Sequence, residues 1–266
     1  MMIELKPLAV TDDCEATAFL SEQTGLSKSR IKLAMTRGAV WLEREGRQRR
    51  LRRAKTTLSP PDKIGIYYDE SILSTEPPKP TLLSDLGCCS IWIKPAGLMS
   101  GGSRFGDHCT IDRVVGNELD RPTFLVHRLD KFAWGLMVLA HGKKSAAHLS
   151  RQFQERTVSK TYQALIRGRL MESRLLDTPI DGKPAISHVR PIRPDEDRTL
   201  VEVRIETGRK HQIRKHLAES GHPIVGDRLY GSEDVSGLQL AAVELGFLHP
   251  ETGEPLTFNL PAEYRF

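Results

Sequence analysis

A proline-rich segment at residues 74–80 divides this chain of 266 residues. Its sequence is Ser-Thr-Glu-Pro-Pro-Lys-Pro, with three prolines in four positions. Proline fixes its own φ and has no N–H to give to a helix or a sheet, so such a run favours an extended, semi-rigid connector. We therefore expect a small domain at residues 1–72, a connector at residues 73–86 and a larger body at residues 87–266.

The small N-terminal part is strongly basic. Residues 28–55 contain eleven Lys or Arg and only two Glu, whereas the whole chain has a net charge of +5, so the remainder is acidic. Like charges at this density repel one another unless something neutralises them, which indicates a polyanion such as a nucleic acid. An ordinary solvated surface stays open as an alternative. An anionic membrane is a poorer partner, because no Trp- or Phe-rich apolar stripe accompanies the charges.

Composition and missing motifs exclude several classes of protein. A content of 39% hydrophobic and 27% charged residues is typical of a soluble globular chain. The sequence has no apolar run long enough to span a membrane and no secretory signal, so we expect a cytoplasmic monomer without a membrane partner. The four cysteines form no C-x-x-C pair, and the phosphate-loop, H-E-x-x-H and G-x-S-x-G motifs are absent. We accordingly expect no metal and no cofactor.

Hydrophobic spacing predicts a mixture of strands and helices. In the N-terminal part it predicts helices at 14–24 and 27–36 and strands at 40–42 and 64–67. In the body it predicts strands at 135–140, 161–166 and 199–206 and helices at 143–154 and 209–220. Clean alternation at 199–206 favours an antiparallel sheet. The predicted class is α+β: a mixed, largely antiparallel sheet with flanking helices, plus a small α/β N-terminal domain.

Two charged clusters in the body could hold the chemistry. Asp130 ends the segment Phe-Leu-Val-His-Arg-Leu-Asp and lies between two apolar stretches, so it needs a cation to stay charged. The segment 207–216 supplies one candidate, Arg214, on the same predicted helix as His211. An Asp paired with Arg can act as a nucleophile or a base, but it can equally be a buried pair that only orders the core.

The N-terminal part resembles the small RNA-binding domain first seen in ribosomal protein S-four. The resemblance rests on Ser27–Arg30, on Arg37–Val40 and on the segment Asp62–Ile64. It implies that one helix end meets RNA phosphates, through Lys28, Arg30, Lys32 and Arg37. Such contacts add affinity but little choice of sequence.

The body resembles the RluA-type RNA pseudouridine synthases over almost its whole length. The matching motifs occur in the family's order and are Lys94–Leu98, His127–Asp130 with Gly135, Lys160–Ala164, Thr207–Arg214 with Gly221–Asp227, and Leu238–Leu240 with Phe247–Pro250. The resemblance implies a cofactor-free isomerisation of a specific uridine to pseudouridine in structured RNA. An appended S-four-like domain favours ribosomal RNA. By the same resemblance the catalytic residues are Asp130, Tyr162 and Arg214, and the substrate-binding residues are Arg128, Leu240, His211 and Arg209.

One departure from the family pattern bears on activity. Ala133 and Trp134 stand where the family has Thr and Ser, so two hydroxyls that would fix the Asp130 loop are lost. The indole could fill that space or narrow the pocket. Two alternative functions therefore stay open: a non-catalytic RNA-binding or folding factor on a degenerate synthase scaffold, and a synthase directed at tRNA.

Overall fold

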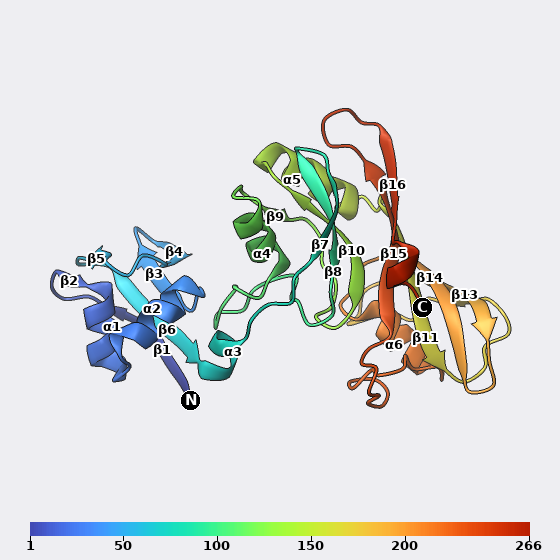
Figure 1. Cartoon of the computed structure of the whole chain (residues 1–266), viewed down its shortest axis with the longest axis horizontal. Coiled ribbons are helices and arrows are strands. Elements are labelled where there is room, and N and C mark those ends of the chain that lie inside the picture. The colour runs from blue at the N-terminus through green and yellow to red at the C-terminus, as the bar shows by residue number, and fades with distance from the viewer. The chain divides into compact units, whose positions relative to one another are not determined.

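The chain folds into two compact units. The computed structural model describes residues 1–266 (Figure 1) and places residues 1–77 and 101–114 in the first unit and residues 78–100 and 115–266 in the second. The division at Pro77 lies inside the predicted connector at 73–86. That connector also contains a strand, Thr81–Asp85, because the residues after the last proline have N–H groups free to pair with a neighbouring strand. Residues 101–114, expected in the body, belong to the first unit.

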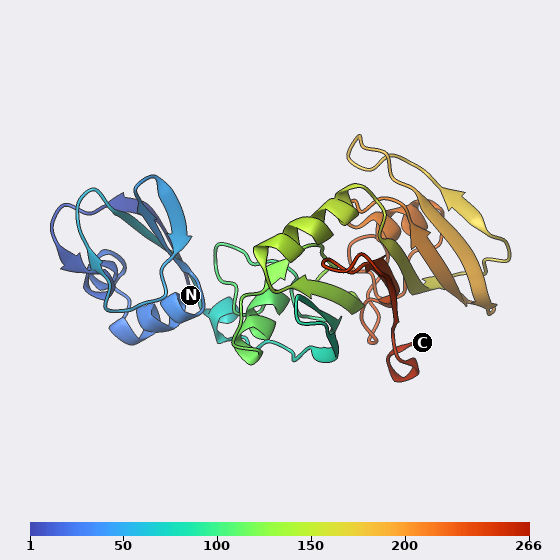
Figure 2. The same cartoon turned by 90° about the horizontal axis from the view of Figure 1, so that it is seen from above.

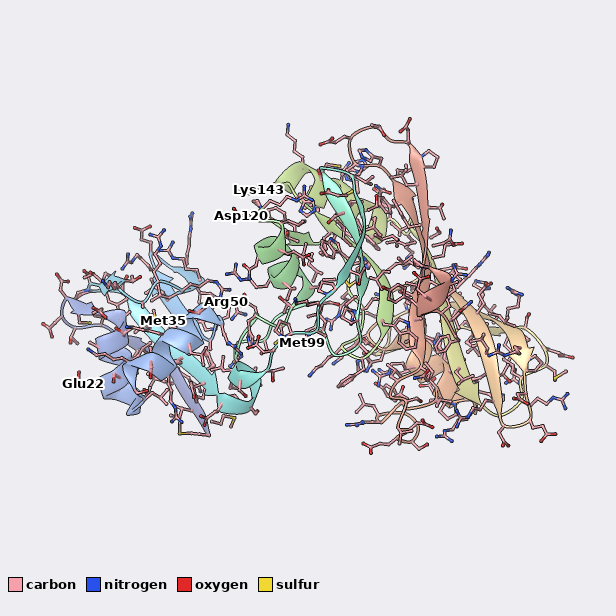
Figure 3. The ribbon with its side chains drawn as sticks, viewed as in Figure 1. Glu22, Met35, Arg50, Met99, Asp120 and Lys143 are labelled. Carbon is pink, nitrogen blue, oxygen red and sulfur yellow. The ribbon has the colours of Figure 1, made fainter.

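The first unit packs helices on a small antiparallel sheet with the strand order β1-β6-β3-β4. Its elements are β1 (Met2–Ala9), β2 (Cys14–Glu15), α1 (Ala16–Thr24), α2 (Lys28–Thr36), β3 (Val40–Arg44), β4 (Arg47–Arg50), β5 (Thr57–Leu58), β6 (Lys63–Asp69) and α3 (Glu70–Ser74). Met35 on α2 is fully buried in this core, whereas Glu22 on α1 is exposed (Figure 3). The predicted helix at 14–24 starts two residues late, because Cys14 and Glu15 pair with β5 instead.

The second unit is built on one large sheet with the strand order β12-β13-β14-β11-β15-β10-β8-β7, with β16 beside β15 and β9 beside β10. Its strands are β7 (Thr81–Asp85), β8 (Cys89–Lys94), β9 (Phe124–Leu125), β10 (Trp134–Ala140), β11 (Ser159–Arg167), β12 (Arg174–Leu176), β13 (Ser187–Pro194), β14 (Arg198–Ile205), β15 (Leu240–Leu248) and β16 (Pro255–Asn259). Only β10 and β15 pair in parallel. The predicted mixed, largely antiparallel α+β fold is therefore confirmed.

Two helices of this unit connect its strands, α5 (Lys143–Gln154) and α6 (Gln212–Glu219), and a short 3-10 turn, η1 (Ala262–Tyr264), follows the last strand. A further helix, α4 (Ile111–Glu118), contains the point where the chain passes from the first unit to the second. Helix α5 packs on β10 and β15 (Figure 2) and buries Leu149 between them. Its bounds are the predicted ones, because its apolar residues recur at helical spacing. No helix of the chain has the length and apolarity needed to cross a membrane.

Glycine allows the parallel pair of strands to come close together. Gly135 on β10 lies opposite Ala242 on β15, with φ at 112°. A Cβ at this position would collide with the backbone of Ala242, so no other residue fits without moving a strand. The close approach brings the loop before β10, which carries Asp130, beside the start of β15, which carries Leu240.

Candidate active site

One cavity of the second unit, about 290 Å³ in volume, collects the residues that sequence motifs single out. Its walls come from the loop before β10, from β11, from the turn before α6 and from the start of β15. All seven expected catalytic and substrate-binding residues line it: Asp130, Tyr162, Arg214, Arg128, Leu240, His211 and Arg209. These positions span more than a hundred residues of sequence, and the fold brings them to one place.

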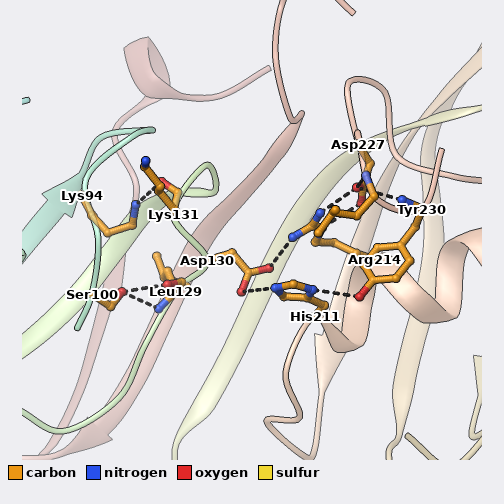
Figure 4. A network of polar contacts seen from close by, with 10 residues as sticks. Lys94, Ser100, Leu129, Asp130, Lys131, His211, Arg214, Asp227 and Tyr230 are labelled. Carbon is orange, nitrogen blue, oxygen red and sulfur yellow. Dashed lines mark hydrogen bonds and ion pairs between the residues drawn. The ribbon is translucent and has the colours of Figure 1, made fainter. Parts of the chain in front are cut away.

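The guanidinium of Arg214 lies between two carboxylates (Figure 4). Its Nε and Nη2 each donate a hydrogen bond of 2.7 Å to Asp227, and its Nη1 donates one of 3.2 Å to Oδ2 of Asp130. The side chain of Asp227 is fully buried, whereas that of Asp130 is 17% exposed at the cavity. Asp227 thus fixes the arginine from behind, and the carboxylate of Asp130 stays open to a ligand.

The electrostatics of the pair Arg214 and Asp227 favour its charged state. Burial disfavours the charged form of Arg214, but hydrogen bonds to Asp227 and Asp130 outweigh burial and raise the pKa of the guanidinium. Burial likewise works against the carboxylate of Asp227. Hydrogen bonds from Arg214 and from the backbone N–H groups of Leu229 and Tyr230 outweigh it and lower the pKa of Asp227. A charged Asp227 therefore neutralises Arg214 permanently.

His211 links Asp130 to a tyrosine. Its Nε2 lies 3.7 Å from Oδ1 of Asp130, and its Nδ1 lies 2.9 Å from the hydroxyl of Tyr230. Burial and the charge of Arg214 lower the pKa of His211, although Asp130 acts in the opposite direction. A neutral ring that accepts the Tyr230 O–H at Nδ1 carries its own proton at Nε2, facing Asp130.

His211 also changes where the helix starts. Its φ of 56° is left-handed, so it cannot belong to the helical run, and α6 begins at Gln212 rather than at the predicted Arg209. Arg209 lies in the turn before the helix, and its Nε donates to the carbonyl of Pro184. Such strained backbone at a non-glycine residue is typical of functional sites.

Two buried side chains hold the backbone on either side of Asp130. Ser100 Oγ donates to the carbonyl of Leu129 at 2.8 Å and accepts from its N–H at 3.0 Å. Lys94 Nζ donates to the carbonyl of Lys131 at 3.2 Å and to the carbonyls of Pro95 and Leu98. Burial lowers the pKa of Lys94 to about 7, against the raising effect of the nearby Asp130 charge. These contacts fix the loop that the family's two missing hydroxyls were expected to fix.

Tyr162 and Leu240 form the apolar wall of the cavity. Burial, aided by the charge of Asp130, raises the pKa of Tyr162, so its phenol stays protonated at neutral pH. Tyr162 lies opposite Ala242 of β15, two residues beyond Leu240. This wall can pack against a flat ring while Asp130 faces it.

The indole of Trp134 does not line the cavity. Its Nε1 donates to the carbonyl of Tyr264 at 3.0 Å, and its ring packs against Phe266 at a centroid distance of 5.0 Å. The expectation that this indole fills or narrows the pocket is therefore wrong, because Trp134 packs against the hydrophobic core that contains Leu136 and Val138 of its own strand. Ala133 lines the cavity and leaves it open.

The four cations expected to bind RNA in the first unit differ in their surroundings. Arg30 pairs with Glu70 at 2.9 Å, and Arg37 pairs with Glu76 and donates to the carbonyls of Leu73 and Thr75. Lys28 and Lys32 are exposed and form no ion pair. The helix start is capped by Ser27, as its sequence position indicates.

Sequence reasoning missed four residues that position the site: Asp227, Tyr230, Lys94 and Ser100. Two signals pointed to them. Asp227 closes the motif Gly221–Asp227, and Lys94 opens the motif Lys94–Leu98. Tyr230 and Ser100 carry no comparable signal, because their role depends on contacts with distant segments. No group of three or more His, Cys, Asp or Glu side chains is placed to hold a metal ion.

Comparison with known proteins agrees with the geometry. A family model described as RNA pseudouridylate synthase matches residues 89–219. An uncharacterized RNA pseudouridine synthase of Chloroflexus aurantiacus is 41% identical, covering 57% of this chain and 54% of its own. The uncharacterized RNA pseudouridine synthase YlyB of Bacillus subtilis is 34% identical, covering 78% and 72%. Ribosomal large subunit pseudouridine synthase D of Vibrio vulnificus is 36% identical, covering 52% and 51%. The chain thus spans about half the length of two of these relatives.

Solved structures share the fold. Human RNA pseudouridylate synthase domain containing 1 superposes with a TM-score of 0.60 at 23% identity, covering 71% of this chain and 87% of its own. Human RNA pseudouridylate synthase domain containing 4 gives 0.58 at 24% identity, covering 69% and 90%.

Proposed function

The chain belongs to the RNA pseudouridylate synthase family, and on this premise we propose that it isomerises uridine to pseudouridine in structured ribosomal RNA, without a cofactor. The observation that carries the proposal is the open carboxylate of Asp130, paired with Arg214 and facing the Tyr162 wall of a nucleoside-sized cavity. Ribosomal RNA is the proposed substrate because several relatives bear the name ribosomal large subunit pseudouridine synthase D.

The reaction balances within the substrate. The bond between uracil N1 and ribose C1′ breaks, the detached base turns, and a new bond joins C5 to C1′. The proton leaves C5, and N1 gains one. Because nothing is oxidised or reduced, no electron carrier or energy carrier is consumed.

Asp130 is the proposed nucleophile or base on the sugar–base unit. Arg214 donates a hydrogen bond to this carboxylate and orients it, since the arginine is itself fixed by Asp227. Tyr162 packs on the uracil face and keeps its own proton, because its pKa is raised. Leu240 completes the apolar wall.

RNA must present the uridine outside its stack. Flipping a nucleotide costs roughly a few kcal/mol of lost stacking, which contacts to the RNA backbone must offset. Arg128 lies exposed at the rim of the cavity and is proposed to hold the flipped site open or contact a phosphate. We also propose that residues 1–72 form an S-four-like RNA-binding domain, in which Lys28 and Lys32 offer unpaired charge.

The test is tritium release from RNA labelled at C5 of uridine. The wild-type chain is incubated with an unmodified large-subunit ribosomal RNA transcript and, separately, with unmodified tRNA. Release from the ribosomal transcript, lost in Asp130→Asn, is the expected result. Release from tRNA alone would replace the substrate proposed here. No release from either RNA, with binding intact, would leave a non-catalytic RNA-binding factor.

A further inference from the structure

A second cavity of about 330 Å³ lies beside the Asp130 cavity in the same unit. The two cavities share Arg128, Tyr162 and Arg209 on their common wall. Beyond that wall the second cavity is lined by Lys160 at the start of β11 and by Arg156 in the turn after α5. The second cavity therefore adjoins the proposed uridine site.

Its four cations have no anionic partner. Arg128, Arg156, Lys160 and Arg209 form no ion pair with any carboxylate of the chain. The single acidic residue in the wall, Glu206, contacts His188 at 2.8 Å. Two arginines on neighbouring strands differ from these cations in this respect.

Arg190 and Arg204 on β13 and β14 show this contrast. Both pair with Glu202, at 3.1 Å and 3.8 Å. Glu202 thus neutralises these two arginines, which line neither cavity, whereas the four cations of the second cavity have no carboxylate partner.

Burial makes the missing partner costly. Lys160 is half-buried, and burial together with the positive charge of Arg156 lowers its pKa. The adjacent His127 stays neutral: its Nε2 accepts the N–H of Val138 at 3.0 Å, and burial lowers its pKa to about 3. A partly dehydrated ammonium beside a second cation destabilises the free protein, and an anion entering the cavity would relieve it.

Strand geometry sets the distance between this charge and the uridine site. Lys160 and Tyr162 are two residues apart on β11, so their side chains point to the same face. Their separation along the strand is about 7 Å. An anion held by Lys160 therefore lies close to a base packed on Tyr162, within reach of the same RNA strand.

Resting on the proposed function, we propose that this second cavity is a phosphate subsite, which binds the backbone phosphate of the nucleotide next to the flipped uridine. Lys160 and Arg156 are its dedicated ligands, and Arg128 and Arg209 are shared with the uridine site. The proposed ligand is RNA because a strand that places its flipped uridine in the first cavity carries a backbone phosphate only one nucleotide away, at the adjoining second cavity.

The test compares neutral variants of the full-length chain. Lys160→Met and Arg156→Gln each remove one charge from the subsite. Lys144→Met on α5 is the matched control, because Lys144 is exposed and lines neither cavity. Binding of an unmodified large-subunit ribosomal RNA transcript is measured from 50 to 200 mM salt. Tritium release gives kcat and KM in parallel, and thermal unfolding without RNA gives Tm.

The subsite predicts a specific pattern. Each subsite variant lowers the slope of log affinity against log salt by about 0.7 to 0.9, and the control leaves it unchanged. KM rises about tenfold, while kcat changes less than about threefold. The Tm of Lys160→Met is unchanged or raised, because the removed charge had no partner.

Two results would overturn the phosphate subsite alone. The first is that both subsite variants keep the salt slope and the KM of the wild type while the wild type still releases tritium. The second is that the Tm of Lys160→Met lies several degrees below that of the control. In both cases the proposed function stands. Absence of tritium release from the wild type instead overturns the proposed function, and the assignment of a phosphate beside a target uridine falls with it.

Discussion

Asp227 holds Arg214 with two hydrogen bonds of 2.7 Å, from Nε to Oδ2 and from Nη2 to Oδ1. This bidentate contact is fully buried on the aspartate side and shorter than the 3.2 Å contact from Arg214 to Asp130. The arginine is therefore positioned by a residue that no ligand reaches, and its remaining N–H group is presented to one that a ligand can reach.

The two aspartates should separate stability from activity. Asp227→Asn leaves Arg214 with a buried charge facing only Asp130, and breaking a buried pair costs about 3 to 5 kcal/mol. Asp130→Asn should abolish tritium release yet change the free energy of unfolding by less than about 1 kcal/mol. Urea unfolding and the release assay measure both quantities. Equal loss of stability in the two variants would show that Asp130 is a structural partner.

Tyr230 should act through His211. Tyr230→Phe removes the hydroxyl that lies 2.9 Å from Nδ1 of His211, and one neutral hydrogen bond stabilises by about 1 kcal/mol. We expect kcat for tritium release to fall about fivefold to tenfold with little change in KM, because the imidazole then loses the contact that orients it toward Asp130. Tyr264→Phe, at a tyrosine outside the cavity, is the control. A kcat equal to that of the control would remove His211 from the positioning network.

His127 should make the protein sensitive to mild acid. Its pKa is about 3 in the folded chain against 6.5 when unfolded, so between these values the unfolded chain binds more protons and stability falls as pH falls. The slope cannot exceed about 1.4 kcal/mol per pH unit for one proton. His127→Gln keeps an acceptor for the N–H of Val138 and should lose less stability between pH 6.5 and 4.5. Urea unfolding at several pH values checks this, and parallel curves for both proteins would contradict it.

Trp134 should matter for stability and not for turnover. Trp134→Phe loses the hydrogen bond to the carbonyl of Tyr264 and should cost about 1 to 2 kcal/mol, while kcat stays within about twofold. Ala133→Leu is the matched change on the cavity side, and its extra bulk should lower kcat/KM more than a hundredfold. A large fall in kcat for Trp134→Phe, together with an unchanged kcat/KM for Ala133→Leu, would place the indole in the substrate site.

Local patterns in the sequence predicted the elements whose form depends on their own residues. The bounds of α5 follow from apolar spacing, and β14 follows from alternation. The start of α6 did not follow, because His211 takes a left-handed backbone conformation that no local pattern signals. The strand β7 was likewise not predicted, because it follows three prolines and forms only by pairing with β8, which its own composition does not indicate.

In the candidate site, too, the sequence did not predict contacts between residues that lie far apart in the chain. The need of Asp130 for a cation made Arg214 a candidate partner, but 84 residues separate them, so the sequence left open whether the pair is catalytic or only orders the core. The supporting residues were out of reach for a different reason. Tyr230 and Ser100 are ordinary polar residues by sequence, and only the fold shows that one reaches His211 and the other reaches the backbone beside Asp130.

The backbone clamps at Leu129 and Lys131 have a consequence for how the reaction begins. Ser100 and Lys94 fasten the peptide groups on both sides of Asp130, so the carboxylate is set in position by main-chain anchoring before any RNA arrives. The chain then spends none of its binding free energy on ordering this loop, and that free energy stays available for extracting the nucleotide from its helix.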